Sequence, residues 1–187
     1  MKSILFVTGN SYKFEVAKKT LSEAGIEVIQ QKLETPEIQS DDSSEIARFS
    51  AKWAANKLGK PAVVTDTGYY IEALNGFPGP FIKFINKWLT AEELIKLMEG
   101  KENRQAEIRI CMAYCEPGQE PVNFVTKVKG IIALSPGMPM DGGYAMDRIF
   151  ITEGFNKVDS EIPKLEMVKF WMDKEHYWHE LAKYLSR

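Results

Sequence analysis

The chain has 187 residues, of which 27% are charged and 44% apolar, values that are ordinary for a globular protein. This length suits one compact domain over residues 1–187, either alone or with a small lobe. The 24 basic and 26 acidic residues give a net charge of −2 and form no basic block. This balance argues against nucleic acid as the main partner, because neutralising its phosphates requires clustered Lys and Arg.

Membrane spans and disulfides are not expected. No apolar stretch approaches the ~20 residues that cross a bilayer, and the N-terminal apolar run is too short for a signal peptide. Cys111 and Cys115 share one face of an expected strand, but they lie too far apart for a disulfide. We therefore expect reduced thiols and a cytoplasmic location.

The first expected elements are a strand and a helix. Residues 3–7 form a short apolar run, typical of a strand buried on both faces. Phe14, Ala17 and Leu21 then recur at helical spacing, and Gly25 stands where a helix would end. Asn10 or Ser11 can cap this helix, because either side chain accepts a hydrogen bond from an amide of the first turn.

The next segments continue the alternation. A second strand is expected over residues 26–34, followed by a polar loop over 35–43 and a short buried strand over 61–66. Between loop and strand, a helix starts at Ser43 or Ser44 and ends at Gly59. Its pattern predicts that the following side chains face inward: Ile46, Phe49, Trp53 and Leu58.

The second half mixes helices and strands. Residues 68–81 form an extended stretch, two helices follow over 84–89 and 90–100, and Thr90 caps the second. Residues 106–116 and 122–134 alternate as antiparallel strands, and a loop over 135–150 ends in a short strand. A single helix is expected from Pro163 to the end. The fold class is therefore α/β with a mixed sheet.

Lys13 raises a question about the first helix. A cation in the first turn opposes the helix dipole, so Lys13 is locally mispaired. An anion bound there would explain Lys13 together with the free amides and the hydroxyl of Thr8, since these groups form a phosphate-shaped site. An ordinary exposed lysine is an equally good reading of this stretch alone.

Polar groups also follow the expected strand over 61–66. Asp66 and Thr67 come at its carboxyl end, the edge where open α/β sheets bind ligands. Asp66 could be a general base or a metal ligand, although a turn-forming Asp before Gly68 is the commoner case. Glu37 and the Asp41–Asp42 pair could reach the same edge. Carboxylates beside an anion site suggest Mg²⁺, which takes one or two carboxylates plus substrate phosphates.

Other catalytic signatures are weak. Neither a Walker A pattern nor GxGxxG occurs. His176 and His179 have the wrong spacing for a helical zinc motif and are better read as the surface of the terminal helix.

Several stretches together resemble the inosine triphosphate pyrophosphatase family, also called the Ham1 family. The stretch "TGNSYK" matches its T-x-N-x-x-K signature, "TDTG" its acidic motif, and "ALNGFPGPFIKF" its most recognisable stretch. "TPEIQS" matches the loop with a metal-binding glutamate, and "GGYAMDRIF" is a looser version of F-G-[YW]-D-P-x-F. The resemblance covers nearly the whole chain, with the motifs in the family's order.

The resemblance implies a fold, an activity and roles for single residues. Family members hydrolyse the triphosphates of inosine and xanthosine, and their deoxy forms, to monophosphate and pyrophosphate with Mg²⁺. The implied fold is an elongated mixed sheet flanked by helices, with two lobes, a nucleotide cleft between them, and a homodimer. Asp66 would activate the water and bind the metal together with Glu37. The residues that would contact the nucleoside triphosphate are Thr8, Gly9, Asn10, Lys13, Thr67, Lys83, Tyr144 and Asp147.

This sequence also departs from the family pattern. The Ser-His-Arg that recognises the purine is replaced by Trp171, Met172 and Asp173, and one metal-binding acid is Thr65. The lysine of the second helix is Ser50, flanked by Arg48 and Lys52, and another expected lysine is Met167. The prediction is a pyrophosphatase with a rebuilt base pocket. The alternatives are a nucleotide-binding homologue with little hydrolysis and an interaction protein that keeps only the fold.

Overall fold

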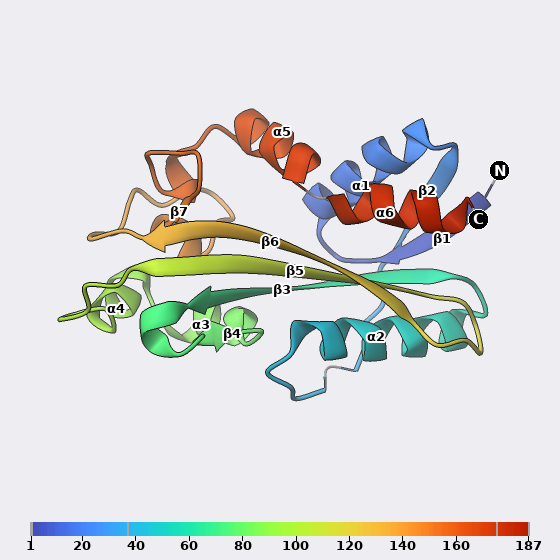
Figure 1. Ribbon diagram of the computed structural model, residues 1–187, viewed down its shortest axis with the longest axis horizontal. Helices are drawn as coiled ribbons and strands as arrows, with labels where there is room; N and C mark the ends of the chain where they lie inside the picture. Colours follow the sequence, from blue (N-terminus) through green and yellow to red (C-terminus); the bar gives the residue numbers. More distant parts are fainter. Residues whose placement is uncertain (1, 37, 175, 187) are drawn as a thin grey trace. The chain divides into compact units, whose positions relative to one another are not determined.

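One sheet contains strands from most of the sequence, between Lys2 and Thr152. The computed structural model describes residues 2–36, 38–174 and 176–186. Six strands of the described part follow the order β2-β1-β3-β5-β6-β7, and β4 pairs with β3 (Figure 1). The strands are β1 (Lys2–Val7), β2 (Ile26–Gln31), β3 (Ala62–Ile71), β4 (Pro78–Gly79), β5 (Gln105–Cys115), β6 (Val122–Ile132) and β7 (Phe150–Thr152). β1 pairs in parallel with β2 and β3, whereas β7 is antiparallel to β6, which confirms the mixed sheet.

The helices connect these strands or follow the last of them in the sequence. The α-helices are α1 (Ser11–Glu23), α2 (Ser43–Leu58), α3 (Ile82–Trp88), α4 (Ala91–Lys96), α5 (Lys164–Lys174) and α6 (His176–Leu185). The short 3₁₀ helices are η1 (Glu72–Leu74), η2 (Met146–Arg148) and η3 (Asp159–Glu161). None of the described helices is long and apolar enough to cross a membrane.

The chain divides into two compact units. Unit 1 comprises Met1–Asp66, Ile110–Thr126 and Phe170–Arg187, and unit 2 comprises Thr67–Arg109 and Lys127–Lys169. The division passes through strands β3, β5 and β6, so each of these strands contributes residues to both units.

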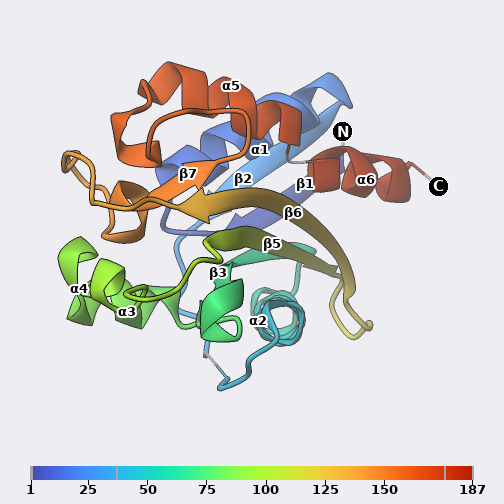
Figure 2. The same cartoon turned by 60° about the vertical axis from the view of Figure 1, so that its left-hand side comes forward.

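Unit 1 is built around β1. Ile4, Leu5, Phe6 and Val7 are all buried, as predicted for a strand covered on both faces. Helices α1 and α6 cover one face and α2 the other, which the two views of the ribbon show (Figures 1 and 2). Trp178 of α6 is fully buried and its ring contacts the Phe6 ring edge-on at a centroid distance of 5.1 Å. This aromatic contact holds α6 against β1.

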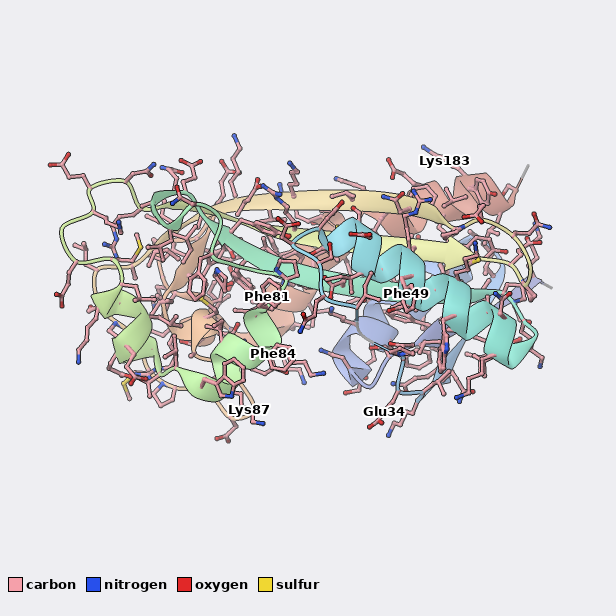
Figure 3. All side chains as sticks on the ribbon, turned by 90° about the horizontal axis from the view of Figure 1, so that it is seen from below. Glu34, Phe49, Phe81, Phe84, Lys87 and Lys183 are labelled. Atoms are coloured by element: carbon pink, nitrogen blue, oxygen red, sulfur yellow. The ribbon has the colours of Figure 1, made fainter. Side chains whose placement is uncertain are left out.

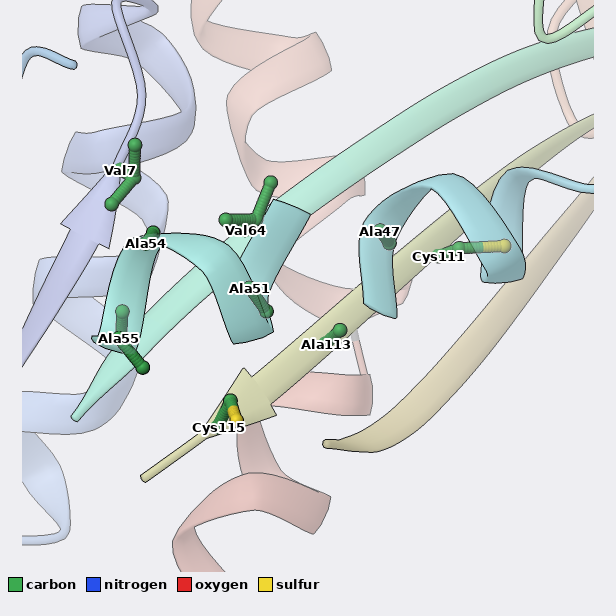
Figure 4. Close-up of a cluster of buried hydrophobic side chains, with 10 residues drawn as sticks. Val7, Ala47, Ala51, Ala54, Ala55, Val64, Cys111, Ala113 and Cys115 are labelled. Atoms are coloured by element: carbon green, nitrogen blue, oxygen red, sulfur yellow. The ribbon is translucent and has the colours of Figure 1, made fainter. Parts of the chain in front are cut away.

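The buried face of α2 differs from the prediction. Phe49, expected to point inward, is 41% exposed and projects from the helix (Figure 3). The face that meets the sheet consists of small side chains, which pack on Val64, Ala113 and Cys115 (Figure 4). Those small residues are Ala47, Ser50, Ala51, Ala54 and Ala55. A face of small residues lets the helix approach the sheet closely, whereas the predicted large residues would hold it away. Trp53 and Leu58 only flank this cluster.

The C-terminal segment is helical on both sides of residue 175, which lies outside the described residues. His176 and His179 are both exposed, as expected for the surface of a terminal helix. Cys111 and Cys115 are both buried, and neither forms a disulfide.

Unit 2 depends on a close approach of two backbones. β4 pairs antiparallel with β3, with Tyr69 opposite Gly79. A Cβ atom added at Gly68 would lie 2.9 Å from the carbonyl carbon and oxygen of Gly79, so this position admits no side chain. The glycine of "TDTG" is therefore required by the pairing of β3 with β4, whereas Gly79 of "FPGPF" is favoured by its positive φ of 58°. Further along, Thr90 and Glu93 form the capping box of α4, as predicted.

Candidate active site

The turn between β1 and α1 is held by a chain of hydrogen bonds in unit 1. The Thr8 hydroxyl accepts from the Asn10 backbone N–H at 3.1 Å, and Asn10 Oδ1 accepts from the Lys13 backbone N–H at 3.1 Å. Asn10 is thus the N-cap of α1, one of the two predicted caps. The Gln30 side chain on β2 donates to the Thr8 carbonyl at 3.1 Å, which anchors the turn to the next strand.

The electrostatics of this turn favour an anion. The first turn of α1 contains no acidic residue, so the positive end of the helix dipole is not compensated by its own side chains. Gly9 and Asn10 are exposed and Lys13 is half-buried, which leaves the turn accessible. A Cβ at Gly9 would meet nothing within 4 Å, so the space above the turn is open. An exposed helix start with a nearby ammonium is a suitable phosphate site.

The prediction that Asp66 ends its strand was wrong, because β3 continues to Ile71 and Asp66 lies in the middle of this strand. The register of β1 with β3 pairs Phe6 with Val63, so Gly9 and Asp66 each follow three residues after that pair. Asp66 is half-buried, and its Oδ2 atom is shielded from solvent. The parallel register places Asp66 at the level of the β1–α1 turn, which contains Thr8, Gly9, Asn10 and Lys13, at the point where β1 ends and β3 continues.

Among the described residues near this turn, Asp66 supplies a carboxylate that could contribute to binding a divalent cation. No group of three or more His, Cys, Asp or Glu side chains able to hold a metal occurs among the described residues. Glu37, the other predicted ligand, lies outside the described residues, and Thr65 supplies only a hydroxyl. One or two carboxylates completed by water and phosphate oxygens is the usual arrangement around Mg²⁺.

The remaining predicted residues lie in unit 2. Thr67 is on β3, Lys83 is an exposed residue of α3, and Tyr144 and Asp147 flank the start of η2. The Tyr144 backbone N–H donates to Asp147 Oδ2 at 2.8 Å, so these two residues form one turn. The Met146 N–H donates to Asn86 Oδ1 of α3 at 3.3 Å, which links this turn to the helix of Lys83. The sequence had given no signal for Asn86 or for Gln30.

The side chains on α3 are unusually exposed for their size. Phe81 and Phe84 are 42% and 40% exposed, and both project from the start of α3 (Figure 3). The Lys83 ammonium lies 6.0 Å from the centre of the Phe84 ring.

The cations that flank Ser50 do not take the place of the missing lysine of α2. Ser50 is 2% exposed and faces the sheet, whereas Lys52 pairs with Glu120 and lowers the pKa of that carboxyl. Arg48 and Lys52 line a surface pocket of about 660 Å³ together with Phe49 and Glu120. Because Arg48 and Lys52 stand on a different face of α2 from Ser50, they cannot reach the space beneath Ser50.

The residues that replace Ser-His-Arg lie on α5 in unit 1. Trp171 and Met172 are half-buried, and Asp173 is exposed. The Trp171 ring packs edge-on against Phe170 at a centroid distance of 5.3 Å. This segment therefore offers apolar surface and a carboxylate where the family pattern has a cationic hydrogen-bond donor.

Comparison with known proteins identifies the family. The sequence model of the Ham1 family matches residues 4–170. The chain belongs to the Ham1 family. It is 43% identical over 166 residues to a protein of Methanopyrus kandleri named "dITP/XTP pyrophosphatase", which covers 89% of this chain and 87% of the relative. A protein of Methanosarcina acetivorans with the same name is 44% identical over 154 residues, covering 82% of this chain and 83% of the relative.

Solved structures of Ham1 proteins have the same fold. The HAM1 protein of Coxiella burnetii superimposes with a TM-score of 0.79 at 26% identity, covering 100% of this chain and 99% of that one. The Staphylococcus aureus Ham1 protein gives a TM-score of 0.78 at 22% identity, covering 99% of this chain and 98% of that one. The predicted family and the mixed α/β fold are confirmed.

Proposed function

We propose that this Ham1 protein is a nucleoside triphosphate pyrophosphatase that hydrolyses deoxyinosine, inosine and xanthosine triphosphates to the monophosphate and pyrophosphate. The observation that carries the proposal is the Thr8–Lys13 turn, an accessible helix start with a lysine and no acid in its first turn. The names of the relatives that are more than 40% identical over most of the chain support the same reaction.

We assign the following roles to the residues of unit 1. Lys13 and the free amides at the start of α1 bind the negative phosphate oxygens, with the turn held rigid by the Thr8 and Asn10 hydrogen bonds. Asp66, half-buried on β3 at the level of this turn, orients the attacking water and accepts its proton. The water oxygen bonds to phosphorus, and the anhydride bond between the monophosphate and the pyrophosphate breaks.

A Mg²⁺ ion is proposed as the cofactor. Asp66 would hold it together with Glu37, and the bound cation would neutralise charge on the phosphates. Thr65 in place of a family acid leaves one carboxylate fewer at this position. Metal affinity in the absence of nucleotide is therefore expected to be low, because substrate oxygens must complete the coordination.

In unit 2 we propose that Thr67, Lys83, Tyr144 and Asp147 contact the substrate, as the resemblance implies. The hydrogen bonds from Tyr144 to Asp147 and from Met146 to Asn86 keep this turn in one conformation. Base recognition cannot use the Ser-His-Arg pattern, and Trp171 and Met172 supply apolar surface instead. A homodimer in the cytoplasm is also proposed, and the two free cysteines fit a reducing compartment.

The test is pyrophosphate release with Mg²⁺ over a panel of dITP, ITP, XTP and the four ordinary deoxynucleoside triphosphates. A higher rate of turnover for dITP or XTP than for dGTP supports the proposed substrate class. The alternative of a nucleotide-binding homologue without hydrolysis is not favoured, because the relatives are named as pyrophosphatases. Binding without turnover of any panel member would reinstate that alternative.

A further inference from the structure

The side chain of Arg109 on β5 is held by an aromatic ring and a carboxylate of unit 2. The central carbon of its guanidinium lies 3.9 Å from the centre of the Tyr70 ring, which is a cation–π contact. Its Nε–H donates to Glu107 Oε1, and the Lys127 ammonium of β6 lies 4.0 Å from the same oxygen. Glu107 and Arg109 are two residues apart on β5, so their side chains share one face of the strand.

The position of the Tyr70 ring depends on glycines at two of its edges. A Cβ added at Gly68 would lie 2.8 Å from ring atom Cε2. On the other edge, a Cβ at Gly76 would lie 3.7 Å from Cδ1, and one at Gly79 would lie 3.6 Å from Cε1. The ring therefore packs between stretches of backbone, and it gives the Arg109 guanidinium a fixed surface to lie on.

The outer edge of this guanidinium is available to a ligand. Neither Nη1 nor Nη2 of Arg109 donates a hydrogen bond to any residue that the structure describes. The side chain is 37% exposed, so a ligand can reach these donors. In Arg104, by contrast, Nε and Nη2 donate to the carbonyls of Ile132 and Ala133. Arg104 therefore holds the backbone together, whereas Arg109 presents unused donors at an accessible surface.

The charge of this group favours an anion with more than one negative charge. Arg109 and Lys127 carry two positive charges against the single negative charge of Glu107. The guanidinium is planar, so its two Nη groups can donate side by side to two oxygens of one phosphate. Phosphate and pyrophosphate both match this geometry and this charge.

We propose that Tyr70, Glu107, Arg109 and Lys127 form a phosphate-binding site, in which Nη1 and Nη2 of Arg109 donate to two phosphate oxygens. Tyr70 supports the guanidinium, Glu107 fixes its orientation through Nε, and Lys127 adds charge. The phosphate belongs either to a bound nucleotide or to free inorganic pyrophosphate, which offer the same chemistry. The nucleotide as source rests on the proposed function, whereas the site itself does not. The predicted site contains none of these four residues.

The first test requires no activity. In protein labelled with ¹⁵N-arginine, the Nε–H signal of Arg109 is identified by its loss in Arg109→Lys, and inorganic pyrophosphate is added without metal. We expect this signal to move in a saturable manner. The Nε–H signal of Arg104, which is bonded to the Ile132 carbonyl, should stay in place. An Arg109 signal that stays in place, or that drifts linearly together with Arg104, would mean an adventitious ion only and would overturn the proposal.

A pair of lysines on β6 tests how the site is built. Lys127→Ala should raise the pyrophosphate Kd read from the Arg109 signal by about threefold, as expected for an exposed charge interaction. Lys129→Ala removes another exposed lysine two residues further along β6 and should leave this Kd unchanged. The same Kd in both variants would contradict the site as proposed.

The same signal identifies the source of the phosphate. A dITP analogue with a methylene group between the α- and β-phosphates cannot release pyrophosphate. If this analogue moves the Arg109 signal and competes with pyrophosphate, the nucleotide supplies the phosphate. If only pyrophosphate moves the signal, the site binds the free anion. A signal that neither compound moves would refute the site.

Kinetics test the nucleotide as source. Arg109→Lys should raise KM about tenfold, as expected when hydrogen bonds to a charged group are lost, and equally for dITP and XTP because the phosphate does not differ between them. Lys101→Ala, at an exposed position before β5, is the control and should keep the wild-type KM. A changed ratio of KM between dITP and XTP would show that Arg109 contacts the base and would overturn the assignment. Absence of turnover with a saturable Arg109 signal would refute the proposed function and leave the site confirmed.

Discussion

The side chain of Asn10 accepts a hydrogen bond from the backbone N–H of Lys13 at 3.1 Å, so the residue that caps α1 also fixes the backbone of Lys13 in the first turn. The cap satisfies one amide at the start of the helix and leaves others available to a ligand. Lys13, whose charge opposes the helix dipole, therefore belongs to a turn whose unpaired amides and lack of acidic residues favour an anion.

Replacing Lys13 tests the phosphate site. Lys13→Ala should weaken nucleotide binding by about 1.5–3 kcal/mol, the range of hydrogen bonds to charged groups, and should abolish most of the nucleotide-induced rise in melting temperature. Lys18→Ala removes an exposed lysine from the same helix and should leave both unchanged. Unchanged nucleotide affinity in Lys13→Ala would show that the phosphates bind elsewhere.

Two substitutions of Asn10 test helix capping and anion binding separately. Asn10→Asp keeps a good cap, so the melting temperature should change little, but its charge should repel the triphosphate and raise Kd at least tenfold. Asn10→Ala should instead cost about 1 kcal/mol of stability. Calorimetric titration with nucleotide and thermal unfolding measure the two effects. Tight nucleotide binding by Asn10→Asp would argue against an anion at this turn.

Asp66→Asn should separate binding from chemistry. The amide is nearly isosteric with the carboxyl group but cannot accept the water proton, so kcat should fall by at least about a hundredfold. Nucleotide affinity measured without metal should stay within about twofold, since the phosphate contacts come from the β1–α1 turn. Substantial turnover by Asp66→Asn would move the role of general base to another residue.

Gly68 provides a test of the fold that is independent of the nucleotide. Gly68→Ala places a Cβ at 2.9 Å from the Gly79 backbone and should destabilise the protein by about 1–3 kcal/mol, as overpacking does. Gly9→Ala is the comparison, because nothing lies within 4 Å of its Cβ, and it should unfold at the wild-type temperature. Equal melting temperatures for both variants would mean that β3 and β4 do not cross as described.

Metal removal should affect activity and leave stability alone. No described cluster of three ligands could hold a structural metal, so EDTA should not change the melting temperature of the nucleotide-free protein. Turnover should be lost with EDTA and restored by excess Mg²⁺. A large fall in melting temperature on chelation would reveal a structural metal.

Local sequence signals predicted the elements that depend on neighbouring residues. The cap at Asn10 and the capping box at Thr90 were correct, because both are decided within one helical turn. The predicted inward face of α2 was correct only in part: Trp53 and Leu58 pack against the core cluster, whereas Phe49 is exposed and the buried centre of the face consists of small side chains around Ala51. The distance between helix and sheet is a tertiary property that the sequence of α2 alone does not contain.

The burial of Asp159 in unit 2 could not be predicted from the sequence, because it too depends on tertiary contacts. "Val-Asp-Ser" around Asp159 is a common turn sequence, and nothing in it indicates that Thr152 will bury the carboxyl group. Its partner Thr152 is on β7, so only the assembled unit shows that this carboxyl group is buried and hydrogen-bonded. The triphosphate contacts were inferred from family motifs, and they stay predictions for this chain.

The most direct test of the proposed reaction is ³¹P NMR of the products formed from dITP with the wild-type protein and Mg²⁺. We expect deoxyinosine monophosphate and pyrophosphate in equal amounts, with no diphosphate and no inorganic phosphate. Formation of the diphosphate with inorganic phosphate, or an unchanged spectrum from folded protein that binds dITP, would contradict a pyrophosphatase.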